Sequence, residues 1–191
     1  MRVGKNERMD FSDIAGDIEE ELFSPEDIAG IVARLAAEVE ADYEGRDVLL
    51  VGVLKGAATF MTDLARQLGR HVELDWMAVS SYGAGTQSSG VVRILKDLDT
   101  DVTGRHVLIA EDIIDSGLTL SWLRENLESR GAASVEICAL LRKPEALKVQ
   151  VDARYVGADI PNRFVVGYGL DYAERYRNLR GIGVLAPHVY S

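Results

Sequence analysis

The chain has 191 residues, of which 47% are hydrophobic and 27% are charged, and its net charge is −10 at neutral pH. These values are typical of one globular domain whose core is large enough to need no disulfides. The acidic balance argues against a nucleic-acid surface, because a phosphate backbone selects basic faces. No apolar stretch approaches the roughly 20 residues of a membrane helix, and the N-terminus lacks an apolar signal core. We expect a cytoplasmic protein without nucleic-acid or membrane partners.

Several common catalytic and metal-binding patterns are missing from the sequence. The only cysteine, Cys138, lies in an apolar run and is expected to be buried, and the three histidines share no metal-ligand spacing. The sequence has neither a G-x-x-x-x-G-K-[ST] phosphate loop nor a G-x-G-x-x-G fingerprint, which disfavours kinases and dehydrogenases. A G-x-S-x-G nucleophile elbow is also absent.

The N-terminal part predicts one helix after a loosely ordered extension. Residues 1–16 are polar and charged and show no period. Ser24 and Pro25 predict the start of a helix, since serine caps a helix and proline fits its first turn. Apolar residues then keep helical spacing from Ile28 to Val39.

From residue 47 onward, short apolar runs alternate with helical patterns. Strands are expected at 47–53, 72–78, 91–95, 107–110 and 134–141, helices at 60–68 and 118–130, and short apolar runs follow at 155–158 and 164–168. The Ser- and Gly-rich segment 80–90 predicts a mobile loop. The alternation predicts an α/β fold with a mostly parallel, doubly wound sheet flanked by helices. We expect a single domain over 17–191, with a small hood from about 17–45 and 150–191.

The segment 107–120, VLIAEDIIDSGLTL, carries the strongest functional signal. Its first four residues predict a buried strand, and Glu111 and Asp112 follow directly. Residues 115–119 then open a helix, where backbone N–H groups and hydroxyls can hold a phosphate. Adjacent carboxylates would repel that phosphate, so we assign them to ribose hydroxyls or to Mg²⁺. The segment therefore indicates an enzyme that handles a phosphorylated ribose.

Polar residues at other predicted strand ends extend this site, because ligands of open α/β sheets lie beyond the carboxyl ends of the strands. Asp115 could exchange a proton with a ring nitrogen of a bound base. Lys55 and Gly56 could bind a second phosphate group, or they could simply end a strand in solvent. Lys143 could hold an exocyclic oxygen of a base, or it could also lie in solvent.

Three residues further along the chain add to this hypothesis. Phe164 could stack on a flat ring, although such a residue more often belongs to the core. Asp171 and Arg177 could hold a metal and a pyrophosphate, although most such charges are surface charges.

The segment 107–120 closely resembles the phosphoribosyl-diphosphate signature of the type I phosphoribosyltransferases. Four further segments, in this order and spacing, are similar to the purine branch of that family, the bacterial hypoxanthine or hypoxanthine-guanine phosphoribosyltransferases. They are VGVLKGA at 51–57, SSYG at 80–83, LLRKP at 140–144 and FVVGYGLDY at 164–172. The resemblance runs from about residue 18 to residue 190, and the last segment is the one that points to purines.

The resemblance implies a purine-salvage enzyme with the type I phosphoribosyltransferase fold. Such an enzyme transfers the 5-phosphoribosyl group from phosphoribosyl diphosphate to hypoxanthine and/or guanine, giving IMP or GMP and pyrophosphate. The family requires Mg²⁺ and usually forms a homodimer or homotetramer. A flexible loop closes over the site and excludes water from an oxocarbenium-like transition state.

The resemblance also implies a role for each matching residue. Asp115 would be the acid/base group at purine N7. The ribose and the 5′-phosphate would be bound by Glu111, Asp112, Asp115, Ser116, Gly117, Leu118 and Thr119. Pyrophosphate would be bound by Lys55, Gly56, Arg177, Ser81 and Tyr82. The peptide bond before Lys55 would be cis. The purine would be bound by Lys143 at its 6-oxo group, by stacking on Phe164, and by Val165 and Asp171. A first Mg²⁺ would be held by Glu111 and Asp112, and a second by Asp171.

The sequence also departs from the family pattern and leaves alternatives open. Arg142 stands where many bacterial members have an acid, Ala158 stands where a larger apolar residue is common, and residues 1–16 have no clear counterpart. An RNA-binding regulator on the same fold is a second interpretation, which the acidic charge and Asp115 disfavour. The same reaction on another base, such as xanthine or adenine, is a third interpretation. The pattern of Lys143 and Phe164 disfavours adenine, but it does not sharply separate xanthine from hypoxanthine and guanine.

Overall fold

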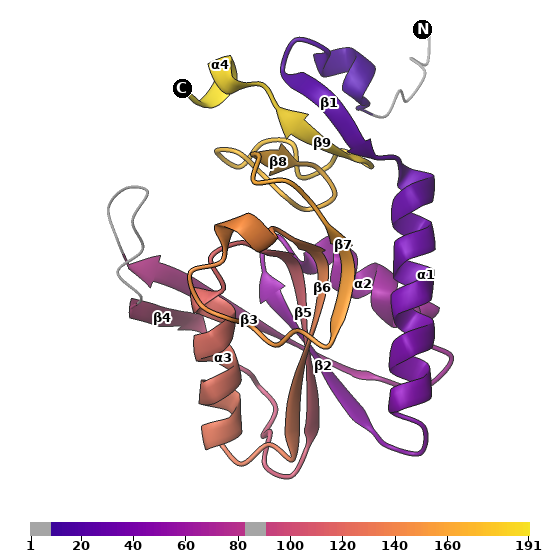
Figure 1. Ribbon diagram of the computed structural model, residues 1–191. Helices are drawn as coiled ribbons and strands as arrows, with labels where there is room; N and C mark the ends of the chain where they lie inside the picture. The colour runs from indigo at the N-terminus through magenta and orange to yellow at the C-terminus, as the bar shows by residue number, and fades with distance from the viewer. Residues whose placement is uncertain (1–8, 83–90) are drawn as a thin grey trace, which may run out of the picture.

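The computed structural model describes residues 9–82 and 91–191, except for the side chains of Ser81, Tyr82 and Val91. Its strands form one sheet of six strands and one of three. The large sheet, with helices on both faces, makes the body of the molecule, and the small sheet lies beyond one end of it (Figure 1). Among the described residues, no helix is long and apolar enough to cross a membrane.

The large sheet confirms the predicted doubly wound fold. Its strands lie in the order β4-β3-β2-β5-β6-β7, and all neighbours pair in parallel except β4, which is antiparallel to β3. The winding direction reverses between β2 and β5, and ligands of such sheets bind beyond the carboxyl ends of the strands at this reversal. The strands are β2 (Val48–Leu54), β3 (Glu73–Tyr82), β4 (Val91–Lys96), β5 (His106–Ile114), β6 (Ser134–Arg142) and β7 (Tyr155–Asp159).

Alternating side chains of the central strands contribute to two cores. Leu50 of β2 packs with α1 and α2 on one face, whereas Leu49 and Val51 pack with α3 on the other. Cys138 is buried on the first of these faces, as predicted. Because both faces are covered, these strands are nearly continuous apolar runs, which is why the sequence predicts them. The helices are α1 (Pro25–Asp42), α2 (Ala58–Gln67) and α3 (Leu118–Ser129).

Helix α1 begins where the sequence predicts. The side chain of Ser24 accepts a hydrogen bond from the N–H of Asp27, and the Asp27 carboxylate accepts one from the N–H of Ser24. This reciprocal capping box satisfies two N–H groups that the first turn leaves free, and Pro25 fits the first helical position.

The small sheet, which we call the hood, is smaller than the sequence suggested. Its antiparallel order is β1-β9-β8, and the short helix α4 follows β9. Helix α1 instead packs on α2 and the large sheet, because its long apolar face needs the larger core, and β7 is an edge strand of that sheet. Part of the extension expected to be loosely ordered forms a short 3₁₀ helix, Phe11–Ile14. The hood elements are β1 (Ile18–Phe23), β8 (Val165–Val166), β9 (Ile182–Leu185) and α4 (Pro187–Tyr190).

Candidate functional site

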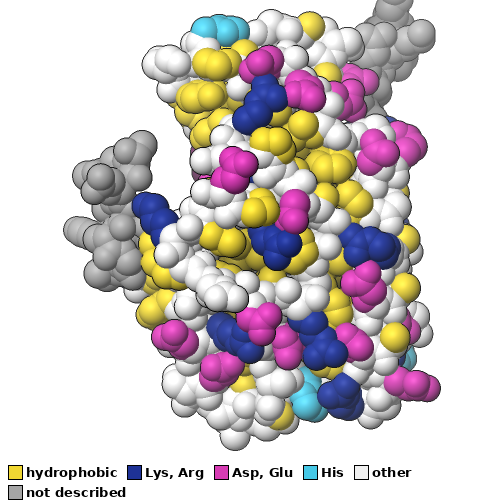
Figure 2. Space-filling model, in the orientation of Figure 1, with side chains coloured by type: hydrophobic (Ala, Val, Ile, Leu, Met, Phe, Trp, Pro, Cys, Tyr) yellow, Lys and Arg dark blue, Asp and Glu magenta, His cyan; other side chains and the backbone are white. Residues whose placement is uncertain are grey.

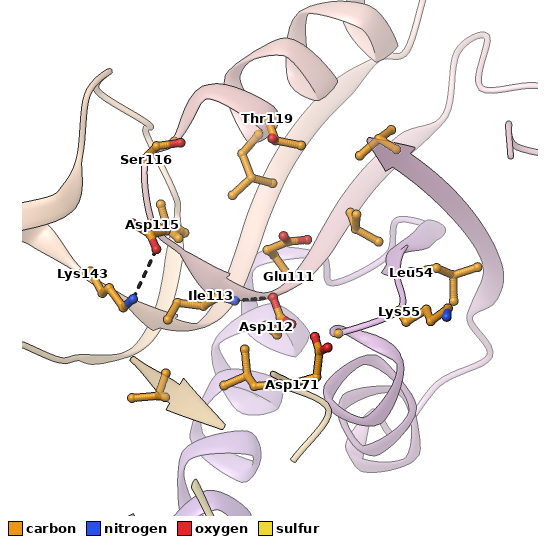
Figure 3. Close-up of a pocket in the computed structure, with 18 of the residues that line it drawn as sticks. Leu54, Lys55, Glu111, Asp112, Ile113, Asp115, Ser116, Thr119, Lys143 and Asp171 are labelled. Atoms are coloured by element: carbon orange, nitrogen blue, oxygen red, sulfur yellow. Dashed lines mark hydrogen bonds and ion pairs between the residues drawn. The ribbon is translucent and has the colours of Figure 1, made fainter. Parts of the chain in front are cut away.

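A cleft of about 450 Å³ lies between the carboxyl ends of the central strands and the hood. Figure 3 shows Asp115 and Lys143 at one end of this cleft and Lys55 at the other, with Glu111 and Asp112 between them. Strand ends therefore bring together the polar residues that the sequence singled out. The lining residues are Val53, Leu54, Lys55, Gly56, Val79, Glu111, Asp112, Ile113, Ile114, Asp115, Ser116, Gly117, Thr119, Leu120, Lys143, Phe164, Val165, Leu170, Asp171 and Arg177.

Glu111 and Asp112 are adjacent acidic residues in the middle of the cleft. Strand β5 runs past the four predicted residues to Ile114, so both carboxylates belong to the strand itself. One oxygen of Glu111 is buried and has no hydrogen-bond partner among the residues that the structure describes. Burial raises the pKa of Glu111, and the neighbouring Asp112 raises it further. Burial also raises the pKa of Asp112, although hydrogen bonds from the N–H groups of Ile113 and Asp112 oppose the rise.

This carboxylate pair has the chemistry of a magnesium site. Mg²⁺ prefers one or two carboxylates together with phosphate oxygens and water. The described residues contain no group of three or more His, Cys, Asp or Glu side chains that could hold a metal. An ion bound at Glu111 and Asp112 would therefore complete its coordination with water or with oxygens of a bound substrate, and the two residues fit such an ion.

The turn Asp115–Thr119 connects β5 to the start of α3. Gly117 has a φ of +80°, and a Cβ there would lie 2.6 Å from Cγ2 of Val151 and 3.0 Å from the carbonyl oxygen of Val149. Glycine is therefore required at this position on both conformational and steric grounds. The members of the turn line the cleft except for Leu118, whose predicted contribution rests on its backbone alone.

Asp115 and Lys143 are paired across the ends of β5 and β6. Nζ of Lys143 lies 3.2 Å from Oδ2 of Asp115. The Lys143 side chain is only 9% exposed, whereas that of Asp115 is 57% exposed. The carboxylate thus offsets a nearly buried positive charge while it stays open to the cleft. A flat ring bound here would meet a proton acceptor and a proton donor side by side.

The loop after β2 has the backbone that the family resemblance implies. The peptide between Leu54 and Lys55 is cis. A Cβ at Gly56 would collide with the Asp112 carboxylate, so only glycine lets the loop pack against this group. A Cβ at Gly169 of the hood would collide in turn with the carbonyl oxygen of Gly56. The loop is therefore held in direct backbone contact with the hood.

Asp171 and Arg177 reach the cleft from the hood. Nη2 of Arg177 lies 2.9 Å from Oδ1 of Asp171, and Nη1 donates a hydrogen bond to the carbonyl oxygen of Gly169 at 2.8 Å. The residue predicted to hold a metal and the residue predicted to bind pyrophosphate thus form an ion pair with each other.

Glu174 is a charged residue of the site that the sequence analysis missed. Its carboxylate lies 3.2 Å from Nζ of Lys55 and 3.4 Å from Nη2 of Arg177. Hydrogen bonds from Arg177 and Lys55 hold the pKa of Glu174 below its usual value. In the sequence, Glu174 is one of several charged residues at 171–177, and nothing in the sequence distinguishes it from an ordinary surface acid.

The remaining predicted residues divide between the cleft and its surroundings. Phe164 and Val165 line the cleft, and Phe164 is 38% exposed, so it is not a core residue. Arg142 is paired with Asp159, with Nε 2.7 Å from Oδ1, and neither Arg142 nor Ala158 lines the cleft. The two departures from the family pattern are therefore not part of the cleft lining.

Strand β3 continues to Tyr82, so the segment predicted as a mobile loop begins as strand. The side chains of Ser81 and Tyr82 and residues 83–90 lie outside the described part of the chain. The pyrophosphate role assigned to Ser81 and Tyr82 stays a prediction.

Known proteins resemble this chain in sequence and in structure. The family model for the phosphoribosyl transferase domain matches residues 19–173. The hypoxanthine-guanine phosphoribosyltransferase of Mycobacterium tuberculosis is 56% identical over 181 residues, which cover 92% of this chain and 90% of that protein. The enzyme of the same name from Streptococcus agalactiae is 52% identical, with 93% and 99% covered. The crystal structure of a hypoxanthine phosphoribosyltransferase from Staphylococcus aureus superposes with a TM-score of 0.90 at 48% identity, covering 94% of this chain and 97% of that one.

Proposed function

The chain belongs to the phosphoribosyltransferase family, and we propose that it acts as a hypoxanthine-guanine phosphoribosyltransferase of purine salvage. It transfers the 5-phosphoribosyl group from phosphoribosyl diphosphate to hypoxanthine or guanine, giving IMP or GMP and pyrophosphate. One observation carries the proposal: a single cleft holds a carboxylate pair, a phosphate-binding turn, the Asp115–Lys143 pair and an exposed Phe164 ring. These four parts match the ribose, the phosphate, the polar edge of a purine and its flat face.

The end of the cleft that contains Lys143 and Asp115 recognises a 6-oxopurine. The Lys143 ammonium donates a hydrogen bond to the 6-oxo oxygen, which adenine lacks. Asp115 lies beside it and takes or returns the proton at N7 as the bond to the sugar forms. Phe164 packs on the face of the ring, and the backbone of Val165 meets the edge of the base. Base selection and proton transfer thus fall on neighbouring side chains.

The sugar end of the cleft binds and orients phosphoribosyl diphosphate. N–H groups and hydroxyls of the turn Asp115–Thr119 hold the 5′-phosphate at the start of α3. Glu111 and Asp112 accept hydrogen bonds from the ribose hydroxyls and would hold one Mg²⁺, and Asp171 would hold a second. Lys55 and Arg177 face the departing pyrophosphate. When bound, magnesium supplies positive charge that offsets the charge on this leaving group.

We further propose that the protein works in the cytoplasm as a homodimer or homotetramer, as the family resemblance implies. The net charge of −10 argues against a nucleic-acid role. On the face drawn in Figure 2, acidic and basic side chains are interspersed, and no large basic patch is seen. A regulator that binds RNA would need a basic patch.

An absorbance assay tests the proposal directly. Purified protein is mixed with phosphoribosyl diphosphate, Mg²⁺ and each of hypoxanthine, guanine, xanthine and adenine. Turnover of hypoxanthine or guanine that stops on addition of EDTA is the expected result. Turnover of xanthine alone would keep the reaction but overturn the assignment of the base. No turnover with any base would overturn the enzymatic proposal, and RNA binding would be measured next.

A further inference from the structure

Phe164 has an aromatic partner that lies outside the cleft. The ring of Tyr190, in α4, stacks on the ring of Phe164, with 5.1 Å between the ring centroids and 26° between the ring planes. Tyr172 meets Phe164 edge-on, with centroids 5.7 Å apart. Phe164 lines the cleft, and neither tyrosine does. The stacked ring of Tyr190 therefore contacts Phe164 from outside the set of residues that line the cleft.

Backbone hydrogen bonds hold α4 beside Phe164. The N–H of Leu185, in β9, donates to the carbonyl oxygen of Phe164 at 2.9 Å. The next residue, Ala186, donates to the carbonyl oxygen of Asp17 at 2.7 Å, and this ties the start of α4 to the segment before β1. Backbone hydrogen bonds within the hood thus fix the start of α4, the helix that carries Tyr190.

We propose that Tyr190 is a positioning residue for the purine site: it holds the Phe164 ring so that its free face is ready for the base. The inference rests on the proposed function. A half-exposed phenylalanine without this support would sample other rotamers and would be ordered only when the base binds. Ordering it in advance removes that cost from binding. A stacked aromatic pair changes an equilibrium constant by about two- to tenfold.

The proposal predicts a selective effect on the base. Tyr190→Ala should raise KM for hypoxanthine and guanine by about two- to tenfold, while KM for phosphoribosyl diphosphate and kcat stay unchanged. Tyr190→Phe keeps the ring and should behave like the unmodified protein. Tyr190→Leu keeps apolar volume without a flat face and should behave like Tyr190→Ala.

Val189→Ala is the matched control, because Val189 is the neighbouring residue of α4 and packs instead with the hood residues Val166 and Leu185. It should leave KM for both bases unchanged. In a Phe164→Leu background, Tyr190→Ala should add nothing, since the ring that it positions is gone.

Three outcomes would overturn the proposal. They are an unchanged KM for both bases in Tyr190→Ala, an equal rise of the KM values for base and phosphoribosyl diphosphate, and a full Tyr190 effect in the Phe164→Leu background. An unmodified protein that converts no purine would instead overturn the proposed function, and this inference with it.

Discussion

Asp115 has two tasks under the proposed function. Its carboxylate lies 3.2 Å from the ammonium of Lys143, which is nearly buried and would be costly to leave unpaired. In the proposed reaction, the same carboxylate would face the purine and take or return the proton at N7 of the base. One residue would therefore both stabilise the pocket and act in the reaction.

Replacing Asp115 by asparagine should separate these two tasks. The amide oxygen of Asp115→Asn can still accept a hydrogen bond from Lys143, but it cannot take a proton from the base. We expect kcat to fall by roughly 10²–10⁴-fold, the usual contribution of general acid/base catalysis. The affinity for phosphoribosyl diphosphate should change little. Steady-state kinetics and titration calorimetry measure the two quantities.

Asp159→Asn is a suitable control for this substitution. Asp159 also carries a paired carboxylate near the end of a strand, but its partner is Arg142 and it does not line the cleft. This variant should keep kcat within about twofold, in line with the small effect of exposed ion pairs. An unchanged kcat in Asp115→Asn would remove the carboxylate from the mechanism.

The sequence predicts those site residues whose signal is local. The acids and the turn at 111–119 stand in one motif, and Lys143 follows a strand that pairs with β5. The sequence does not predict Glu174 and Tyr190, because their contacts are to residues far away along the chain. Glu174 matters because the fold places it between Lys55 and Arg177, and Tyr190 because the hood brings it to Phe164. Neither contact leaves a pattern in the sequence.

Among the elements, β3 is tied to the segment before β5 by a buried carboxylate. Asp75 is 4% exposed, and its Oδ2 accepts hydrogen bonds from the N–H groups of Asp99 and Thr100, each at 2.9 Å. Its Oδ1 accepts one from the N–H of Trp76, and Nζ of Lys96 lies 3.8 Å away. Burial alone would raise the pKa of Asp75, but these hydrogen bonds outweigh burial and hold the pKa below its usual value.

Asp75→Asn should destabilise the protein. The NH₂ group of asparagine would face backbone N–H donors, and the charge that strengthens their hydrogen bonds would be lost. We expect the free energy of unfolding to fall by about 1–3 kcal/mol, the usual cost of a buried hydrogen-bonding group left unsatisfied. Urea unfolding at pH 7, with an unchanged slope against urea concentration, is the measurement.

The effect of Asp75→Asn should also depend on pH. Because the folded-state pKa is depressed, the carboxylate contributes fully above its ordinary pKa of about 3.9, and the contribution is lost as the pH falls through the folded-state pKa. The difference from the unmodified protein should be constant between about pH 7 and 5 and shrink below about pH 4. Asp99→Asn, whose side chain is 87% exposed, should change stability by less than about 0.5 kcal/mol. Equal stabilities of Asp75→Asn and the unmodified protein at pH 7 would contradict the anchoring role.

The elements of the large sheet were predictable, and those of the hood were not. Strands buried on both faces are apolar runs, so β5 and β6 are visible in the sequence. Strand β1 reads IEEELF, with three adjacent acids and no alternation. It pairs with β9, whose residues lie more than 150 positions away, so register comes from the tertiary fold and not from local pattern. Strand β8 has only two residues and gives no signal of its own.

At the scale of the whole molecule, the site is shared between two sheets. Glu111 lies in the large sheet, and Asp115 and Lys143 directly follow its strands β5 and β6. Phe164 comes directly before β8 of the hood, and Asp171 lies between β8 and β9. A ligand that touches both groups binds only to the folded chain, in which the two parts lie together. Its binding free energy therefore adds to the stability of the complete chain.

Phosphoribosyl diphosphate with Mg²⁺ should accordingly raise the midpoint of thermal unfolding. A ligand at 100 times its Kd adds about 2.7 kcal/mol, and each kcal/mol shifts Tm by about 2–4 °C for a chain of this size, so a rise of roughly 5–10 °C is expected. With EDTA, most of this rise should disappear, because Glu111 and Asp112 would face the diphosphate without an intervening cation. Ribose 5-phosphate is the control in scanning calorimetry: it lacks the diphosphate, so its smaller shift should depend little on Mg²⁺. An equal rise with and without EDTA would mean that the carboxylate pair does not hold a metal shared with the substrate.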